Sequence, residues 1–377
     1  MRVNILLGHA FPVPPVAGGA IESRAWEIGT SLSRMGHDVV FYSRAWPGMR
    51  DEEIHGDGLT VVRLPGADWS ASRITNLLNA FTYGRRLVKA TRAADVHVCK
   101  TFFFPFLSEL SGRPQGVVCI GLHRDPKRHL RAYSAVLRRG VAGRLRFTAV
   151  SEFVRRRAEA ICPAMRGLVE VIHNPVDTSV FAPGPSNWPA PTVLWAGRFV
   201  AEKGVEHLLQ AFLRLKVRCR GAKLRLVGAT SPRQGGDPSF VRRLWTISEE
   251  SGWGQDIEFA GFKSGSDLVA EYQKAWLFCY PSYGGEAFPN AVVEAMACGT
   301  PVVTTSFGPF PEQFRDGTEG LQVPSHDVPR LTEALLALLE DNRTRSRFAT
   351  AARTRACGFS LSRIAEQYAT TLRRFAE

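Results

Sequence analysis

Two carboxylates dominate the segment with the clearest capacity for chemistry, residues 281–301 (PSYGGEAFPNAVVEAMACGTP). Its glycines predict a loop after a buried strand, and Pro289 or Asn290 begins a helix whose N-terminus attracts anions. Glu286 lies in the loop, and Glu294 lies in the helix beside apolar residues. Carboxylates accept hydrogen bonds from paired hydroxyls. One carboxylate can therefore hold a hexose while the other holds a ribose.

A second candidate is the segment 197–204 (GRFVAEKG), between a predicted strand and a predicted helix. Arg198 offers a bidentate fork and Lys203 a point charge, a pair that suits a diphosphate. The alternative is a surface ion pair between Lys203 and Glu202. No Asp-x-Asp motif is present to hold a divalent ion. We therefore expect no metal and no other cofactor, with cationic side chains and helix N-termini neutralising the leaving group.

Gly18-Gly19 form a weaker signal in the first half of the chain. Paired glycines just before a helix let a phosphate or a sugar approach the backbone, although an ordinary turn explains them equally well. The Gly-x-Gly-x-x-Gly spacing of a dinucleotide site is absent after the first predicted strand.

Strand-like and helix-like segments alternate along all 377 residues, which predicts an α/β protein with two parallel sheets. Doubly wound domains of this kind bind ligands near the carboxyl ends of their strands. We expect an N-terminal domain, a linker, a C-terminal domain and a last helix that packs back on the first domain; the family resemblance given below makes the first domain acceptor-binding and the second donor-binding. Their expected bounds are 1–172, 173–191, 192–358 and 359–377.

The net charge of +13 is unevenly placed. Residues 1–170 hold 25 Lys and Arg against 14 Asp and Glu, whereas residues 171–377 hold 23 against 21. The first half is therefore expected to meet something anionic, unless its basic surface is simply solvated. We expect no nucleic acid, because the charge lies on the half expected to hold the acceptor. Neither a signal peptide nor a membrane-spanning run is recognisable, so we expect a cytoplasmic protein.

The segment Arg124–Arg146 concentrates this charge, with eight basic residues and one acid. Leu130, Tyr133 and Leu137 fall on one helical face. Such a helix can lie on an anionic membrane, which would make the protein peripheral on the inner face of the cytoplasmic membrane. Equally, its apolar face can pack on the protein's own core.

These stretches resemble the retaining glycosyltransferases of family 4, which have the GT-B fold of two Rossmann-like doubly wound domains facing a central cleft. The Glu-x7-Glu signature of that family matches at Glu286 and Glu294, and its Gly-Arg-…-Glu-Lys-Gly motif matches at 197–204. The opening segment 12–21 (PVPPVAGGAI) is similar to bacterial members that build cell-surface or spore-coat glycans.

The resemblance implies transfer of a hexosyl group from a nucleotide diphosphate sugar, with retained configuration, to a hydroxyl of a glycan, lipid-linked or phosphorylated acceptor. We expect a UDP-sugar. A GDP-mannose donor or a small natural-product acceptor are the alternatives, and a nucleotide-sugar 2-epimerase would lack the Glu-x7-Glu arrangement. Departures from the family at 228–231 and at 310–311, in loops expected to border the donor, leave the sugar open.

The resemblance also implies residue roles. His123, after the apolar strand 116–122, matches a histidine near the transferred sugar, although a lone histidine is more often structural. The expected catalytic residues are Arg198, Lys203, Glu286 and His123. The expected donor-binding residues are Gly18, Gly19, Phe288, Pro289, Asn290 and Glu294.

Overall fold

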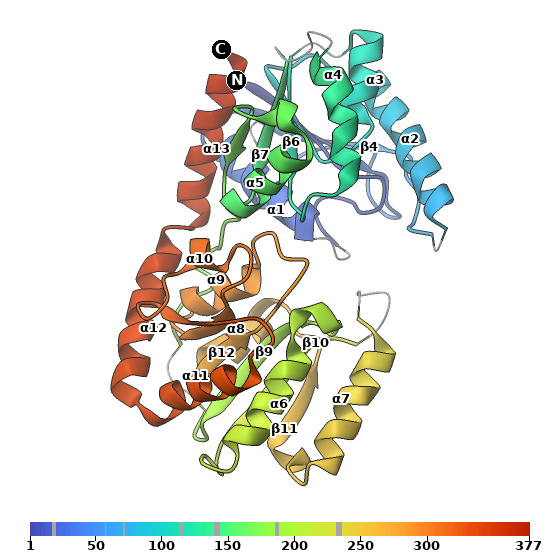
Figure 1. Cartoon of the computed structure of the whole chain (residues 1–377). Helices are drawn as coiled ribbons and strands as arrows, with labels where there is room; N and C mark the ends of the chain where they lie inside the picture. Colours follow the sequence, from blue (N-terminus) through green and yellow to red (C-terminus); the bar gives the residue numbers. More distant parts are fainter. Residues whose placement is uncertain are drawn as a thin grey trace. The chain divides into compact units, whose positions relative to one another are not determined.

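The structure is a computed structural model that describes residues 1–16, 20–56, 58–70, 72–113, 116–138, 144–184, 188–230 and 236–377. The chain divides into two compact units (Figure 1). The first comprises Met1–Pro175 and Leu361–Glu377, and the second comprises Val176–Ser360. Each is an α/β unit built on its own sheet, which confirms the expected fold class.

The first unit contains a sheet in the order β3-β4-β2-β1-β5-β6-β7-β8. β3 pairs antiparallel with β4, and the other described pairings are parallel. The strands are β1 (Arg2–Leu6), β2 (Asp38–Arg44), β3 (Glu52–Ile54), β4 (Leu59–Leu64), β5 (Val96–Cys99), β6 (Val117–Leu122), β7 (Leu145–Ala149) and β8 (Val169–Val171). The helices are α1 (Ala20–Arg34), α2 (Arg73–Ala90), α3 (Phe104–Ser111), α4 (Tyr133–Arg138), α5 (Glu152–Ile161) and α13 (Leu361–Ala376), with a 3₁₀ turn at Arg128–Ala132.

The last helix completes the core of this unit. Ile364, Tyr368 and Leu372 are spaced four residues apart, so they form one stripe along α13. All three are buried in the same apolar cluster as residues of β1, β2 and α1. The stripe therefore closes a core whose members in β1, β2 and α1 lie more than 300 positions earlier in the chain.

The second unit has the parallel order β11-β10-β9-β12-β13-β14. Its strands are β9 (Thr192–Arg198), β10 (Lys223–Ala229), β11 (Ile257–Gly261), β12 (Leu277–Tyr280), β13 (Val302–Thr305) and β14 (Gly320–Val323). Its helices are α6 (Val205–Leu215), α7 (Pro238–Glu250), α8 (Gly265–Lys274), α9 (Asn290–Ala297), α10 (Phe310–Gln313), α11 (Val328–Glu340) and α12 (Asn342–Cys357).

Strand order fixes where a ligand can bind in each unit. Both sheets start with a central strand, wind outward on one side, and then return to the other side at β5 or β12. The crevice at such a reversal, outside the carboxyl ends of the strands, is the usual ligand site of doubly wound sheets. In the second unit, that crevice lies between the ends of β9 and β12.

The boundary between the two units lies between Pro175 and Val176, inside the segment 173–191 that was expected to be a linker. Val176 donates a backbone hydrogen bond to Phe359, and the Trp276 indole donates to the carbonyl of Trp188. Gln273 likewise donates to the carbonyl of Ala182. The described residues after Pro175 therefore pack on the second unit, although their Pro- and Gly-rich sequence lacks periodicity.

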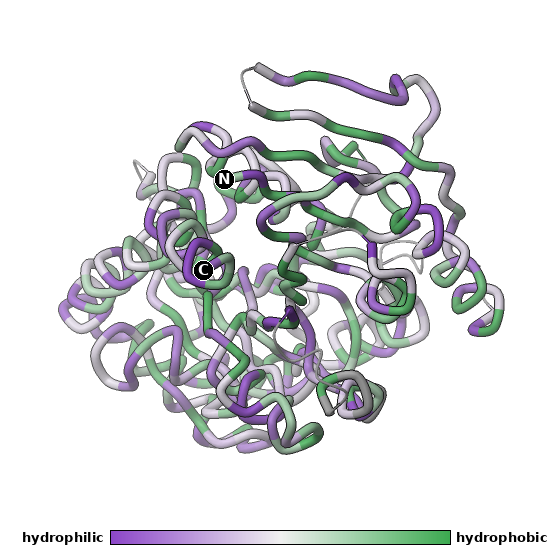
Figure 2. Tube along the Cα trace, turned by 90° about the horizontal axis from the view of Figure 1, so that it is seen from above, coloured by the Kyte–Doolittle hydropathy of each residue, from purple (hydrophilic) through white to green (hydrophobic). Residues whose placement is uncertain are grey.

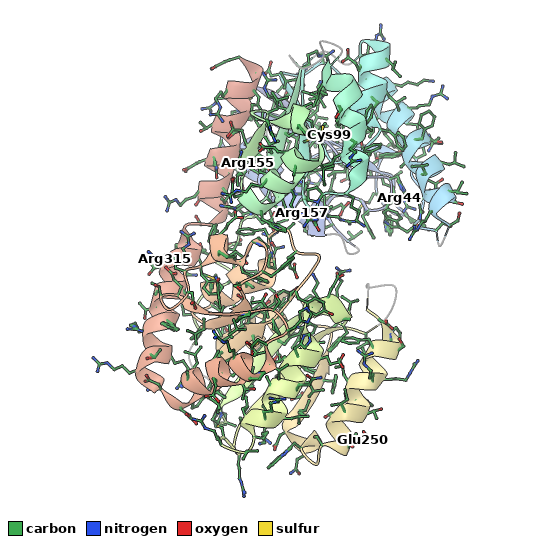
Figure 3. All side chains as sticks on the ribbon, in the orientation of Figure 1. Arg44, Cys99, Arg155, Arg157, Glu250 and Arg315 are labelled. Carbon is green, nitrogen blue, oxygen red and sulfur yellow. The ribbon has the colours of Figure 1, made fainter. Side chains whose placement is uncertain are left out.

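All seven cysteines are free, and five of them are buried. Cys99, at the end of β5, is one of the buried thiols, whereas Glu250 and Arg315 lie at the surface (Figure 3). Among the helices that the structure describes, none is long and apolar enough to cross a membrane.

Candidate donor-binding site

The end of β9 and the loop after β12 form the frame of the site. After Arg198 the chain turns through a short 3₁₀ helix, Ala201–Lys203, and Gly204 then caps α6. Gly204 has φ +71°, and a Cβ on it would lie 2.0 Å from the Pro281 carbonyl oxygen. Only glycine satisfies both the left-handed backbone and this close approach. The conformation of Gly204 therefore lets the two loops touch.

Two hydrogen bonds to one backbone carbonyl then bind the two loops together. The Ser282 hydroxyl and the Tyr283 amide both donate to the Glu202 carbonyl, at 2.9 and 3.0 Å. Gly285 has φ +68°, and a Cβ on it would lie 2.8 Å from a Glu202 carboxylate oxygen. The two segments that the sequence marks for chemistry thus form one structural unit.

A buried ion pair lies at the centre of this frame. Lys203 Nζ is 2.6 Å from Glu286 Oε1, and each residue is only 5% exposed. The partner of Lys203 is therefore Glu286, 83 positions away, and the surface pair with Glu202 is not formed. Burial, together with the charge and hydrogen bond of Glu286, raises the pKa of Tyr280 well above its usual value. The protonated Tyr280 hydroxyl is thus a second donor to this carboxylate.

Glu294 is held by a separate tyrosine. It lies on α9, half-buried, and accepts a hydrogen bond of 3.2 Å from the Tyr272 hydroxyl. Burial, followed by the charge of Glu294, raises the pKa of Tyr272 well above its usual value, so the hydroxyl stays a donor. The side chains that contact Glu286 and Glu294 in these hydrogen bonds are therefore different.

The start of α9 is fixed mainly by packing. α9 begins at Asn290 with Pro289 as its N-cap, as the sequence predicts. The Gln313 amide donates to the Pro289 carbonyl at 2.8 Å. Phe288 is buried, with its ring edge against Phe359. Phe288 and Pro289 thus position the helix N-terminus, while Asn290 remains half-buried at its first turn.

Arg198 differs from Lys203 in its surroundings. It is the last residue of β9 and is exposed. Its charge acts on Tyr280, one of the residues that hold Glu286. An exposed guanidinium at the carboxyl end of a central strand is available to an anionic ligand in the crevice.

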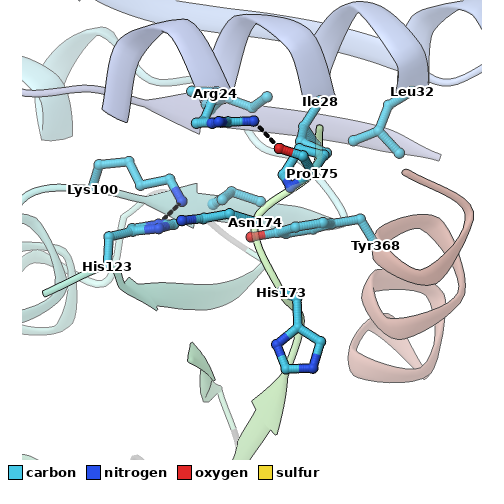
Figure 4. A pocket seen from close by; sticks show the side chains of 12 residues that line it. Arg24, Ile28, Leu32, Lys100, His123, His173, Asn174, Pro175 and Tyr368 are labelled. Carbon is cyan, nitrogen blue, oxygen red and sulfur yellow. Dashed lines mark hydrogen bonds between the residues drawn. The ribbon is translucent and has the colours of Figure 1, made fainter. Parts of the chain in front are cut away.

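His123 lies in the first unit, directly after β6, and Figure 4 shows its contact with Lys100. Lys100 follows the adjacent strand β5, and its ammonium group meets the Nε2 atom of His123. Burial, then the charges of Lys100 and Arg124, lower the pKa of His123 well below its usual value. The imidazole is neutral, and its Nε2 atom accepts a hydrogen bond from Lys100.

Gly121, Glu22 and the residues of one pocket surround the Lys100–His123 pair. A Cβ on Gly121 would lie 2.4 Å from His123 Nε2 and 2.7 Å from Lys100 Nζ, so a larger residue at position 121 would have to displace the pair. Burial lowers the pKa of Lys100 to about 8. Glu22, in the first turn of α1, is buried. Burial raises its pKa, and the charges of Arg124 and Lys100 act in the opposite direction. Lys100 and His123 line a pocket whose wall also contains His173, Asn174 and Pro175.

The structure brings some of the expected site residues close together, whereas others lie outside the described residues. Lys203 and Glu286 are in contact, while Arg198, Asn290 and Glu294 surround the same strand ends in the second unit. Gly18 and Gly19 lie outside the described residues, and α1 begins directly after them at Ala20. Within the part of the chain that is described, no group of three or more His, Cys, Asp or Glu side chains is placed to hold a metal.

Sequence reasoning missed the side chains that hold the site residues in place. Lys100, Tyr272 and Tyr280 each contact a predicted residue, and none was singled out. A signal for Lys100 existed. It follows β5 as His123 follows β6, and residues at the carboxyl ends of neighbouring parallel strands lie side by side.

The buried pair allows a stability test. Lys203→Met leaves the Glu286 carboxylate buried without its cation, which should lower the free energy of unfolding by about 3–5 kcal/mol. The double variant Lys203→Met/Glu286→Gln should recover much of that loss. Arg198→Met, at an exposed position, serves as the control and should change the free energy of unfolding by less than about 0.5 kcal/mol. Chemical denaturation measures all four proteins. Equal losses for Lys203→Met and Arg198→Met would contradict a buried pair.

The histidine pair allows a titration test. Nitrogen NMR of His123 should show a neutral ring at mildly acidic pH, and its Nε2 signal should change near pH 8, where Lys100 loses its proton. Lys100→Arg should remove the change near pH 8, because a guanidinium does not titrate there. Lys100→Met should raise the pKa of His123. An ordinary histidine titration in the wild-type protein would refute the contact.

Two family models together match most of the chain. The model described as Glycosyltransferase Family 4 matches residues 17–180, and the model described as Glycosyl transferases group 1 matches residues 179–355. The first match falls on the half that contains His123, and the second contains the Lys203–Glu286 pair.

Curated relatives and solved structures agree with these matches. The chain is 28% identical to the phosphatidyl-myo-inositol mannosyltransferase of Mycolicibacterium smegmatis, over 97% of this chain and 92% of that protein. It is 32% identical to the D-inositol 3-phosphate glycosyltransferase of the same species, over 47% of this chain and 41% of that protein.

The fold is similar to that of a sucrose-phosphate synthase from Thermosynechococcus elongatus, with a TM-score of 0.81, 21% identity and coverage of 99% and 98%. It is also similar to Anabaena HepE solved with UDP-glucose, with a TM-score of 0.70, 17% identity and coverage of 99% and 100%. At these identities the likeness concerns the fold alone. The fold is therefore the GT-B fold, and the two family matches show that the chain is an enzyme and belongs to the family 4, group 1 glycosyltransferases.

Proposed function

We propose that this glycosyltransferase moves a hexosyl group from a nucleoside diphosphate sugar to a hydroxyl of a phosphorylated or lipid-linked acceptor, with retention of configuration. The observation that carries the proposal is the buried Lys203–Glu286 pair at the strand reversal of the second unit. A buried carboxylate that is paired with an ammonium group is suited to bind sugar hydroxyls.

Each residue of the site has a role in this proposal. Arg198 and Lys203 neutralise the diphosphate as it leaves, aided by the N-terminus of α9 at Asn290. Glu286 holds the hexose, and Glu294 holds the ribose. No proton transfer by these carboxylates is needed for them to bind hydroxyls.

On the acceptor side, the proposal rests on the first unit. Both named curated relatives act, by their names, on inositol phosphates, one of them a lipid. A phosphorylated polyol is also what the basic first half would attract. We therefore propose an acceptor that carries a phosphate, used at the cytoplasmic side of a membrane.

For the donor, two candidates have support. The mannosyltransferase relative supports a mannosyl donor such as GDP-mannose. The UDP-sugar expected from the sequence is supported by HepE, which was solved with UDP-glucose, although that likeness is in the fold only. A thermal-shift panel of both nucleotides and both sugars separates them, because a ligand that binds only the folded state raises its stability.

The two carboxylates should differ in what they bind. Glu294→Gln should weaken the binding of the free nucleoside diphosphate, because this residue is proposed to hold the ribose. Glu286→Gln should leave the free nucleotide bound and impair binding of the nucleotide sugar. Isothermal titration with both ligands measures this, with Glu250→Gln, an exposed carboxylate at the end of α7, as a control outside the proposed site. Equal losses on both ligands for both variants would refute the division of roles.

Transfer should not depend on a metal, because Arg198 and Lys203 take the place of a divalent ion at the diphosphate. Activity should survive an excess of EDTA. Arg198→Ala should instead lower turnover by roughly 100-fold or more, since removing one donor of this type costs a few kcal/mol of transition-state stabilisation. Loss of activity in EDTA, with recovery on adding magnesium or manganese, would show that the proposal is wrong.

A further inference from the structure

Helix α2 of the first unit exposes a row of large apolar side chains. Ile74, Leu77 and Leu78 are 73%, 58% and 60% exposed, and Phe81 is 38% exposed. Positions 74, 77, 78 and 81 follow the i, i+3, i+4, i+7 pattern, so the four side chains form one stripe. A stripe of this kind normally faces a core. Here Ile74, Leu77 and Leu78 face outward, whereas the Phe81 ring also packs edge-on against Phe103.

The helix is nevertheless firmly packed on its opposite face. Tyr83, Gly84 and Leu87 are buried. A Cβ on Gly84 would lie 3.2 Å from both Leu107 and Phe103, so α2 meets α3 and the residue before it at close range. α2 is the helix at the right-hand edge of Figure 2, where hydrophobic and hydrophilic residues alternate along it. The exposed stripe is therefore a second face of a helix that already has its place in the fold.

The charges on α2 all have one sign. Arg73, Arg85, Arg86 and Lys89 are exposed, and the helix contains no Asp or Glu. Trp69, shortly before the helix, is 61% exposed. An apolar stripe beside basic side chains, with an indole at one end, is the composition of helices that lie in the interface of an anionic membrane.

Two alternatives agree less well with these observations than membrane binding by α2 does. One is a dimer contact on α2, and the other is a membrane contact through Arg124–Arg146. A second copy of the chain on this face would bring two sets of the same four cations together, with no acid on the helix to offset them. The segment Arg124–Arg146 is basic too, but its expected apolar face is turned inward. Leu130, Tyr133 and Leu137 are buried, and the Tyr133 ring stacks on Phe106. Among the described side chains of that segment, the apolar face is therefore buried and the exposed residues supply charge.

We propose that α2 docks the enzyme on the surface of an anionic lipid bilayer. Its stripe (Ile74, Leu77, Leu78 and Phe81) enters the boundary between headgroups and acyl chains, and its basic residues meet the lipid phosphates. The proposal deepens the proposed function, since it rests on an acceptor presented at a membrane. Donor binding belongs to the second unit and is independent of it.

Vesicle flotation tests the surface. The full-length protein should float with phosphatidylcholine vesicles that contain phosphatidylglycerol at low salt, less at high salt, and little with pure phosphatidylcholine. Leu77→Gln/Leu78→Gln should lower the partition coefficient on the order of tenfold or more, because two apolar side chains no longer enter the interface. Arg85→Gln/Lys89→Gln should weaken binding and flatten its dependence on salt.

Matched variants make the result specific. Ile54→Gln removes an equally exposed apolar side chain from β3 and should leave flotation unchanged. Lys127→Gln/Arg131→Gln removes two exposed cations from the segment Arg124–Arg146 and should weaken binding less than the α2 variants. Circular dichroism melts check that each variant folds.

Three outcomes would overturn the proposal. One is a wild-type protein that ignores anionic vesicles at low salt. Another is a Leu77→Gln/Leu78→Gln variant that floats as well as the wild type. The third is a dimer in sedimentation experiments that this variant abolishes, without any flotation of the wild type. A thermal shift with nucleoside diphosphates, run on the same proteins, reports the donor site separately. If nucleoside diphosphates cause no thermal shift in the wild-type protein, that result would count against the proposed function instead.

Discussion

The candidate site depends on an ion pair that has been taken out of water. Burying an ammonium group and a carboxylate is costly, and their attraction offsets that cost only when geometry and further hydrogen bonds are favourable. Here the Glu286 carboxylate has both Lys203 and Tyr280 as donors, in a frame set by Gly204. A pair of hydrophobic residues would fill the same space at a lower cost in free energy. The retention of two charges at a strand reversal is thus better explained by a polar ligand than by stability alone.

Much of this arrangement could be predicted from the sequence because strongly patterned segments carry it. The strands before Arg198 and before Pro281 are nearly continuous apolar runs, which is typical of parallel strands covered on both faces. Their ends, together with the start of α9 at Asn290, fall where the pattern places them. Glu286 in a loop and Glu294 on a helix were likewise predictable, because glycines precede one and apolar helical spacing surrounds the other.

The rest could not be predicted because it depends on contacts between distant positions. Nothing local to Lys203 distinguishes Glu202 from Glu286 as its partner, and only the fold brings position 286 close. Short edge strands such as β3 and β14 carry too few residues for a clear pattern. The apolar spacing on Arg124–Arg146 and on α2 is similar in kind, yet one stripe is buried and the other is exposed, which the sequence alone does not decide.

The return of α13 to the first unit has a consequence for synthesis on the ribosome. The first unit's core includes Ile364, Tyr368 and Leu372, which are translated after the whole of the second unit. The second unit, in contrast, is a continuous stretch of chain. The nascent polypeptide can therefore complete its second unit first, while the sheet of the first unit waits with part of its apolar surface uncovered. Folding order would then run opposite to the order of the two halves in the sequence.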